Sequence, residues 1–249
     1  MAGKIHIVGI GPGSPDWLAP AARKAIESAD MIVGYQTYLQ QIESLATAIP
    51  RESSAMRHEI ERARRAIELS EAGKTIAIVS SGDAGIYGMA GLIFELLENR
   101  RMTTVQVEVF PGITALSAAA ALLGAPLMTD FAAISLSDYL TPLDTILRRL
   151  RAAIEADFVI CLYNPRSHQR NEPYERTQQL LLENLGGDHP VGVVRNAFRK
   201  NQEVIVTTLE DLCSLEIGMD SILIIGNSST RIWNGKMVTS RGYRIDQED

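Results

Sequence analysis

Short apolar runs alternate with longer amphipathic segments along this chain. The runs are rich in β-branched residues and predict strands at 4–8, 30–35, 75–79, 105–110, 132–138, 157–162, 191–194, 204–208 and 222–225. The amphipathic segments predict helices near 21–29, 54–72, 92–98, 114–123, 145–156 and 173–185. Strands that alternate with helices in this way indicate an α/β fold with parallel strands.

A break at Gly124-Ala125-Pro126 divides this pattern into two parts, each with its own strands and helices. The 249 residues are enough for two domains of ordinary size. We therefore predict two α/β domains, an N-terminal one at 1–127 and a C-terminal one at 128–249.

The predicted helix 54–72 carries both an apolar face and a group of arginines. The apolar positions at helical spacing are Met56, Ile60, Ala63 and Ile67. The arginines are Arg57, Arg62, Arg64 and Arg65. Glutamates interleave with these arginines, so the pattern favours a solvated face over a phosphate site.

Glycines recur every third residue in the loop that follows the predicted strand 75–79. They lie at positions 82, 85, 88 and 91 around a single carboxylate, Asp83. Glycine allows backbone to approach a ligand closely, and strand-to-helix turns are where open α/β sheets bind ligands. A tight turn that only packs a helix against the sheet is the alternative interpretation.

A second glycine-bearing loop, 111–115, follows the predicted strand 105–110 and opens an alanine-rich helix. In a parallel sheet the carboxyl ends of the strands lie at one edge. We therefore expect the loops at 82–88 and 111–115 to emerge at the same edge, side by side.

The N-terminal strand also runs into glycines, in the order Gly9-x-Gly11-Pro12-Gly13. This spacing differs from the dinucleotide-binding fingerprint, and Pro12 removes a backbone donor that a pyrophosphate would use. His6 lies between two isoleucines on the strand, which favours a structural role. The loop predicts no dinucleotide site.

Composition and charge limit the classes of partner. Hydrophobic residues make up 46% of the chain and charged residues 22%, as in ordinary globular proteins. The net charge of -6 gives no basic footprint for nucleic acid or for a membrane surface. Cys161 and Cys213 are far apart in apolar surroundings, so we predict two buried thiols and no metal site. No signal peptide or membrane-spanning run is predicted, and the expected location is cytoplasmic.

Taken together in order, these motifs resemble the tetrapyrrole (corrin/porphyrin) methyltransferases. They are Gly9-x-Gly11-Pro12-Gly13, Gly82-Asp83-x-x-x-Tyr87-Gly88, Pro111-Gly112-Ile113-Thr114-Ala115, Tyr163-Asn164-Pro165-Arg166-Ser167, Val194-Arg195-Asn196-Ala197 and Ile225-Gly226-Asn227. The resemblance covers essentially the whole chain. Many family members have Gly-Asp-Pro where this chain has Gly82-Asp83-Ala84, which leaves the carboxylate in place.

The resemblance implies two α/β domains with S-adenosylmethionine in the cleft between them. It implies cofactor contacts from Gly82, Asp83, Gly85, Ile86, Tyr87, Ile113, Thr114, Ala115, Leu162, Tyr163, Asn196 and Ala197. It places the loop 9–13 towards the tetrapyrrole, and the substrate-binding candidates are Gly11, Pro12, Asn164, Arg166 and Arg170. A homodimer is the family expectation.

The reaction implied is methylation of precorrin-3B at C-17 with ring contraction to precorrin-4, a step of cobalamin biosynthesis. Methyl transfer depends on positioning and exclusion of water, whereas contraction needs a hydroxyl proton removed. The candidate catalytic groups are Asp83, Ser137, Asp138, Tyr163 and His168. For Asp138 and His168 a turn or surface role is an equal alternative.

Other functions stay open on the sequence. A methyltransferase of the same fold could act on a cobalt-containing corrin precursor, on RNA or on a protein, although the acidic charge argues against RNA. A non-catalytic nucleotide-binding regulator is the other alternative. An absorption spectrum that reveals a co-purifying coloured macrocycle would distinguish these classes.

Overall fold

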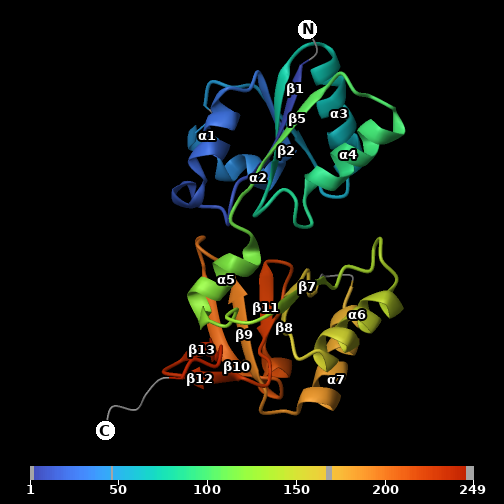
Figure 1. Cartoon of the computed structure of the whole chain (residues 1–249). Helices are drawn as coiled ribbons and strands as arrows, with labels where there is room; N and C mark the ends of the chain where they lie inside the picture. The colour runs from blue at the N-terminus through green and yellow to red at the C-terminus, as the bar shows by residue number, and fades with distance from the viewer. Residues whose placement is uncertain (1–2, 46, 167–169, 245–249) are drawn as a thin grey trace. The chain divides into compact units, whose positions relative to one another are not determined.

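The computed structural model describes residues 3–45, 47–166 and 170–244, and it divides the chain into two compact units (Figure 1). Unit 1 is Met1–Ala115 and unit 2 is Leu116–Asp249. The division falls twelve residues before the predicted boundary after residue 127. Residues 116–127 join unit 2 because they bond to its C-terminal strands: Thr239 Oγ1 donates to the Pro126 carbonyl at 2.6 Å, and Lys236 Nζ donates to the Leu122 carbonyl at 3.0 Å.

Unit 1 is a parallel sheet covered on both faces. Its strands are β1 (Lys4–Gly9), β2 (Met31–Tyr35), β3 (Arg51–Ser54), β4 (Thr75–Ser80) and β5 (Gln106–Phe110), in the spatial order β3-β2-β4-β1-β5. Helices α1 (Pro20–Glu27) and α2 (Gln36–Gln41) pack on one face. Helices α3 (Glu59–Glu71) and α4 (Met89–Asn99) pack on the other face. Alternate strand residues point to opposite faces, so β1 sends Ile7 towards α3 and α4 and Val8 towards α1 and α2.

Helix α3 starts five residues after the predicted start at 54, and its faces differ from the prediction. Ala63 and Ile67 are buried, but Met56 and Ile60 are exposed. Arg62, predicted to be solvated, is only 4% exposed. Its guanidinium donates from Nε to Ser54 Oγ at 2.8 Å and from Nη2 to the Ala55 carbonyl at 3.1 Å, and burial lowers its pKa. Ser54 ends the polar edge strand β3 and Ala55 follows it, and the apolar pattern missed this strand.

Unit 2 contains a mixed sheet, not a purely parallel one. Its strands are β7 (Phe131–Ser135), β8 (Val159–Tyr163), β9 (Pro190–Arg195), β10 (Glu203–Thr208) and β11 (Ser221–Ile225), in the order β10-β9-β11-β8-β7. Only β7 and β8 pair in parallel, and the other neighbours are antiparallel. Helices α6 (Leu143–Glu155) and α7 (Glu172–Leu185) share a hydrophobic core with this sheet. A small second sheet contains β6 (Gly124–Ala125), β12 (Thr230–Trp233) and β13 (Lys236–Thr239). Strand β6 directly follows α5 (Ala115–Leu123) and pairs in parallel with β13, which forms a hairpin with β12.

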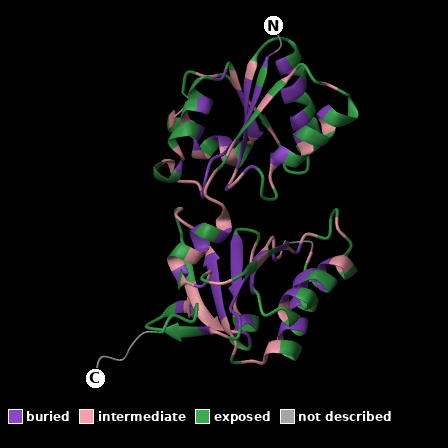
Figure 2. Ribbon diagram, in the orientation of Figure 1, coloured by how far each residue is buried: buried purple, intermediate pink, exposed green. Residues whose placement is uncertain are grey.

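Burial is concentrated on the central strands of each unit (Figure 2). Strand β11 is buried at every position, as is β1 after its first residue. Cys161 in β8 is buried, which raises the pKa of its thiol to about 12, whereas Cys213 is exposed, contrary to the prediction for both. His6 has the structural role predicted for it, because its Nδ1 lies 3.1 Å from the Ala25 carbonyl oxygen and its ring packs edge-on against Phe110. No described helix is long and apolar enough to cross a bilayer.

Candidate functional site

Three loops pack backbone against backbone at the carboxyl edge of the unit 1 sheet. They follow β1, β4 and β5 and approach one another at Gly9, Gly82 and Gly112. A Cβ atom built on Gly112 would lie 2.2 Å from the Gly82 carbonyl oxygen and 2.7 Å from the carbonyl carbon of Gly9. No side chain fits at that distance, so glycine is required at this position.

The loop after β1 is bonded directly to the loop after β4. The Gly11 amide donates to the Gly82 carbonyl at 3.0 Å, and the Gly82 amide donates to the Gly11 carbonyl at 2.8 Å. Both glycines have positive φ, +71° and +66°. Gly11 and Pro12, the substrate candidates of this loop, are both buried.

Asp83 joins the loop after β4 to the loop after β5. Its Oδ1 accepts from the Gly85 amide at 2.7 Å, and its Oδ2 accepts from the Gly112 amide at 3.0 Å. The two glycine loops therefore lie side by side, as predicted for a parallel sheet. Because both carboxylate oxygens accept hydrogen bonds from backbone amides, Asp83 positions the two loops relative to each other.

Replacing Asp83 by asparagine is expected to weaken this joint, because the amide nitrogen of the new side chain cannot accept a hydrogen bond from a backbone amide. Either the exposed Gly85 amide or the part-buried Gly112 amide then loses its acceptor, at a cost of up to about 1–3 kcal/mol in the free energy of unfolding. Chemical denaturation of the purified variant measures this loss. An unchanged free energy of unfolding would show that the Asp83 bonds contribute nothing net.

The outer part of the loop after β4 is exposed. Gly85, Ile86 and Tyr87 form it, with the Ile86 and Tyr87 residues 38% and 55% exposed. A Cβ atom on Gly85 would meet only Asp83 Oδ1, at 3.2 Å. Helix α4 then begins at Met89, whose amide donates to Ser80 Oγ at 3.2 Å. Ile113, Thr114 and Ala115 of the neighbouring loop are half-buried.

In unit 2, Tyr163 ends strand β8 and reaches the start of α5. The Leu116 amide donates to the Tyr163 hydroxyl oxygen at 3.0 Å, so the phenol caps the first turn of that helix. Leu162, the other cofactor candidate on this strand, has a fully buried side chain in the core of unit 2. Only the backbone of Leu162 could therefore contact a ligand.

A hydrogen-bonded network lies where β7 and β8 end. Asn164 has a φ of +51° and donates from Nδ2 to Ser135 Oγ at 2.9 Å. The Ser137 amide donates to the same oxygen at 3.2 Å. Arg170 Nη2 donates to the Asn164 carbonyl at 3.1 Å, and its Nη1 lies 3.6 Å from Asp138 Oδ1. Four predicted residues, Ser137, Asp138, Asn164 and Arg170, thus meet in one network around Ser135.

Arg166 belongs to a separate group at the start of α7. Its Nε donates to Asn171 Oδ1 at 2.8 Å, its Nη2 lies 3.6 Å from Glu175 Oε1, and its guanidinium lies over the ring of Tyr174 at 5.7 Å. Burial raises the pKa of Tyr174 to about 12, against the opposing effect of Arg166. The Arg166 side chain is 35% exposed. The remaining catalytic candidate, His168, lies outside the described residues.

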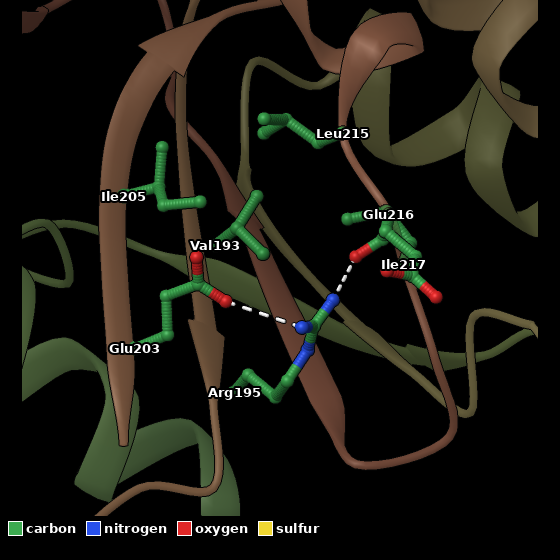
Figure 3. Close-up of a pocket in the computed structure, with 7 residues that line it drawn as sticks. All are labelled: Val193, Arg195, Glu203, Ile205, Leu215, Glu216 and Ile217. Atoms are coloured by element: carbon green, nitrogen blue, oxygen red, sulfur yellow. Dashed lines mark hydrogen bonds and ion pairs between the residues drawn. The ribbon is translucent and has the colours of Figure 1, made fainter. Parts of the chain in front are cut away.

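The last candidates, Asn196 and Ala197, form the turn after β9. Asn196 has a φ of +50° and donates from Nδ2 to Asp220 Oδ2 at 3.1 Å. The preceding Arg195 lines a cavity of about 140 Å³, where it pairs with Glu203 at 3.2 Å and donates to the Glu216 carbonyl (Figure 3). The sequence analysis missed Ser135, Asp220 and Asn171. Ser135 meets Asn164 across 29 positions and Asp220 meets Asn196 across 24, whereas the bond between Asn171 and Arg166 depends on loop geometry.

Comparisons with known proteins agree on one family. Residues 4–213 match the model of the Tetrapyrrole (Corrin/Porphyrin) Methylases. The chain is 46% identical over 247 residues to the cobalt-factor III methyltransferase of Priestia megaterium; the match covers 98% of this chain but only 46% of the longer relative. It is also 46% identical over 241 residues to the probable cobalt-factor III C(17)-methyltransferase of Salmonella typhimurium strain LT2, covering 97% of this chain and 100% of that one.

Solved structures give the same result for the fold. The crystal structure of the methyltransferase CobJ is 34% identical, with a TM-score of 0.90 over 96% of this chain and 100% of that chain. The uroporphyrin-III C-methyl transferase from Thermus thermophilus, solved in complex with S-adenyl homocysteine, is 21% identical with a TM-score of 0.70 over 90% of this chain and 97% of that chain. This second similarity shows a shared fold.

Proposed function

This chain belongs to the tetrapyrrole (corrin/porphyrin) methylase family, and from that premise we propose that it is an S-adenosylmethionine-dependent methyltransferase of cobalamin biosynthesis. Its proposed reaction is methylation of C-17 of precorrin-3B with ring contraction to precorrin-4. The observation that carries the proposal is the match over the full length of the Salmonella C(17)-methyltransferase.

The names of the two relatives favour a second candidate substrate. One is named a cobalt-factor III methyltransferase and the other a probable cobalt-factor III C(17)-methyltransferase, so the cobalt-containing macrocycle competes with precorrin-3B as the natural substrate. The two candidates share C-17 as the proposed site of methylation, and cobalt-factor III brings a metal with it. We therefore treat cobalt as part of the substrate.

The exposed backbone of unit 1 fits a cofactor without phosphates. Residues 85–87 are exposed, and glycine at position 85 leaves room for a ligand. We assign cofactor contacts to this loop and to residues 113–115 in unit 1. In unit 2 we assign them to the Leu162 backbone, Tyr163, and the turn at Asn196 and Ala197. When bound, S-adenosylmethionine supplies the methyl group.

The protein's own contribution is to hold the loops and orient the reactants. Asp83 fixes the two unit 1 loops to each other, and Tyr163 fixes the first turn of α5. Orientation of this kind lowers the barrier of a transfer reaction by several kcal/mol. Asp138, paired with Arg170, and Tyr163 are the described candidates for proton transfer during ring contraction.

Arg166 is the proposed clamp for the carboxylates of the macrocycle. Its guanidinium is held in place by Asn171, Glu175 and Tyr174, yet it is part exposed. Arg166→Ala is expected to raise the KM for the tetrapyrrole at least tenfold, about 1.4 kcal/mol, because a guanidinium binds carboxylate in two-pronged fashion. Arg166→Lys should recover part of the loss, since an ammonium group is a point charge.

Separate titrations of the tetrapyrrole and of S-adenosylhomocysteine against the three proteins measure this effect. Cofactor binding should barely change, because other loops are assigned to it. If Arg166→Ala weakened the binding of both ligands equally, or of neither, Arg166 would not be the substrate clamp.

The proposed function itself is tested by mass spectrometry of products. The purified enzyme is incubated with S-adenosylmethionine and either precorrin-3B or cobalt-factor III, and transfer adds one methyl group to the macrocycle. The absorption spectrum of the product reports the change of chromophore expected on ring contraction. Absence of methylation with both macrocycles would overturn the proposal. The expected homodimer is checked by light scattering of the same preparation.

A further inference from the structure

Ser135 is the residue around which the network of unit 2 is arranged. It ends strand β7 and lies beside Tyr163 in the strand register. Its hydroxyl oxygen accepts two hydrogen bonds, from Asn164 Nδ2 at 2.9 Å and from the Ser137 amide at 3.2 Å. Ser135 is half-buried, and it lies at the end of its strand.

A serine hydroxyl has two lone pairs and one proton. Both lone pairs of Ser135 are used by N–H donors, and among the described residues no hydrogen bond uses its proton. Ser135 can therefore make one further hydrogen bond, and only as the donor. The two N–H groups also polarise the hydroxyl, which strengthens that bond.

The partners of Ser135 are themselves held in place. Asn164 has a φ of +51°, and Arg170 Nη2 donates to its carbonyl at 3.1 Å. Arg170 lies 3.6 Å from Asp138, and its side chain is only 17% exposed. The hydroxyl therefore has a fixed direction, as a donor does that is organised before its ligand arrives.

We propose that Ser135 donates a hydrogen bond to a carbonyl or carboxylate oxygen of the tetrapyrrole. This inference rests on the proposed function and deepens it, because it assigns a substrate contact to a residue that no motif indicated. Arg170 acts through Asn164 as a positioning residue for this contact. Arg170 is itself paired with Asp138, so two candidates of opposite charge belong to the network that includes Ser135.

The test compares Ser135→Ala, Ser135→Thr and Ser135→Cys with the wild type in steady-state methyl transfer to the macrocycle. Ser135→Ala removes the donor and is expected to lower kcat/KM about 100-fold. Ser135→Thr keeps the hydroxyl and should stay within about fivefold of wild type. Ser135→Cys keeps the volume with a weak donor, so it still reports on the contact if the alanine variant fails to fold. Ser214→Ala is the matched control, because it removes a hydroxyl that donates to the Asp211 carbonyl on the surface of the same unit.

The kinetic constants distinguish the two kinds of oxygen. A loss in kcat at constant KM assigns the contact to a reacting carbonyl, and a rise in KM at constant kcat assigns it to a resting carboxylate. Calorimetry with S-adenosylhomocysteine should give wild-type affinity for all variants.

An alanine variant as active as Ser214→Ala would overturn the inference and leave the proposed function standing. A parallel loss of S-adenosylhomocysteine affinity would also overturn it, since the acceptor would then belong to the cofactor. If the wild-type enzyme methylates neither macrocycle, both the proposed function and the inference about Ser135 are overturned.

Discussion

Gly112→Ala is expected to abolish cofactor binding and to destabilise unit 1 strongly. The added Cβ atom would lie 2.2 Å from the Gly82 carbonyl oxygen and 2.7 Å from the Gly9 backbone. These neighbours are backbone atoms, so the clash cannot be relieved by rotating a side chain. The loops after β4 and β5 must separate, which also breaks the bond between the Gly112 amide and Asp83.

The expected cost lies at the upper end of the roughly 1–3 kcal/mol that overpacking typically produces. Chemical denaturation measures it, and calorimetry with S-adenosylhomocysteine should detect no binding. Gly91→Ala is the matched control, because a Cβ atom there meets nothing within 4 Å. Its position in helix α4 predicts a stability that is unchanged or raised by up to about 1 kcal/mol. A Gly112→Ala protein as stable as Gly91→Ala would contradict the packing of the three loops.

Gly85→Val is expected to remove cofactor binding without unfolding the protein. The residue is exposed, and a Cβ atom there meets only Asp83 Oδ1, at 3.2 Å. The protein can therefore accept the side chain with a small shift of that carboxylate. Its two methyl groups would occupy the space that we assign to S-adenosylmethionine.

The affinity for S-adenosylhomocysteine should fall at least 100-fold, about 2.8 kcal/mol, while circular dichroism stays native. Gly91→Val makes the same change at an exposed position of helix α4 in the same unit, and this variant should bind S-adenosylhomocysteine as the wild type does. Unchanged affinity in a folded Gly85→Val protein would show that the loop after β4 is only a packing turn.

The two predictions separate two kinds of glycine in this chain. Gly112 is needed for the approach of backbone to backbone inside unit 1. Gly85 is not needed by the fold, because neither its space nor its backbone angle excludes a side chain. A glycine that the fold does not require is the stronger indication of a ligand.

Local pattern determined most of the elements. The apolar run 75–79 became β4, extended by one residue to Ser80, because a buried strand needs only side chains that suit both covered faces. The same-edge position of the two glycine loops also followed from the sequence, since parallel strands place their carboxyl ends together. The motifs, taken in order, indicated the family that the comparisons confirm.

Edge and surface features were not determined in this way. Strand β3 is polar and half-exposed, so it carries no apolar signal, and hydrogen bonds to β2 alone define it. The sequence pattern predicts a surface position for Arg62. The Ser54 hydroxyl and the Ala55 carbonyl, at the end of β3, accept hydrogen bonds from its guanidinium and allow it to be buried. Cys213 follows the apolar Leu212, yet it lies on the exposed side of a short turn of helix.

The sequence by itself determined the two-part α/β order, the glycine loops and the family, because these depend on neighbours along the chain. Only the tertiary structure decided what each site residue does. Asp83 meets the Gly112 amide across 29 positions, and Asn164 meets Ser135 across the same separation. The register of the strands, and which loops lie at the same edge of the sheet, determine such hydrogen-bond partners. The Ser135 hydroxyl, with both lone pairs occupied, can be recognised only when its distant donor Asn164 is in place.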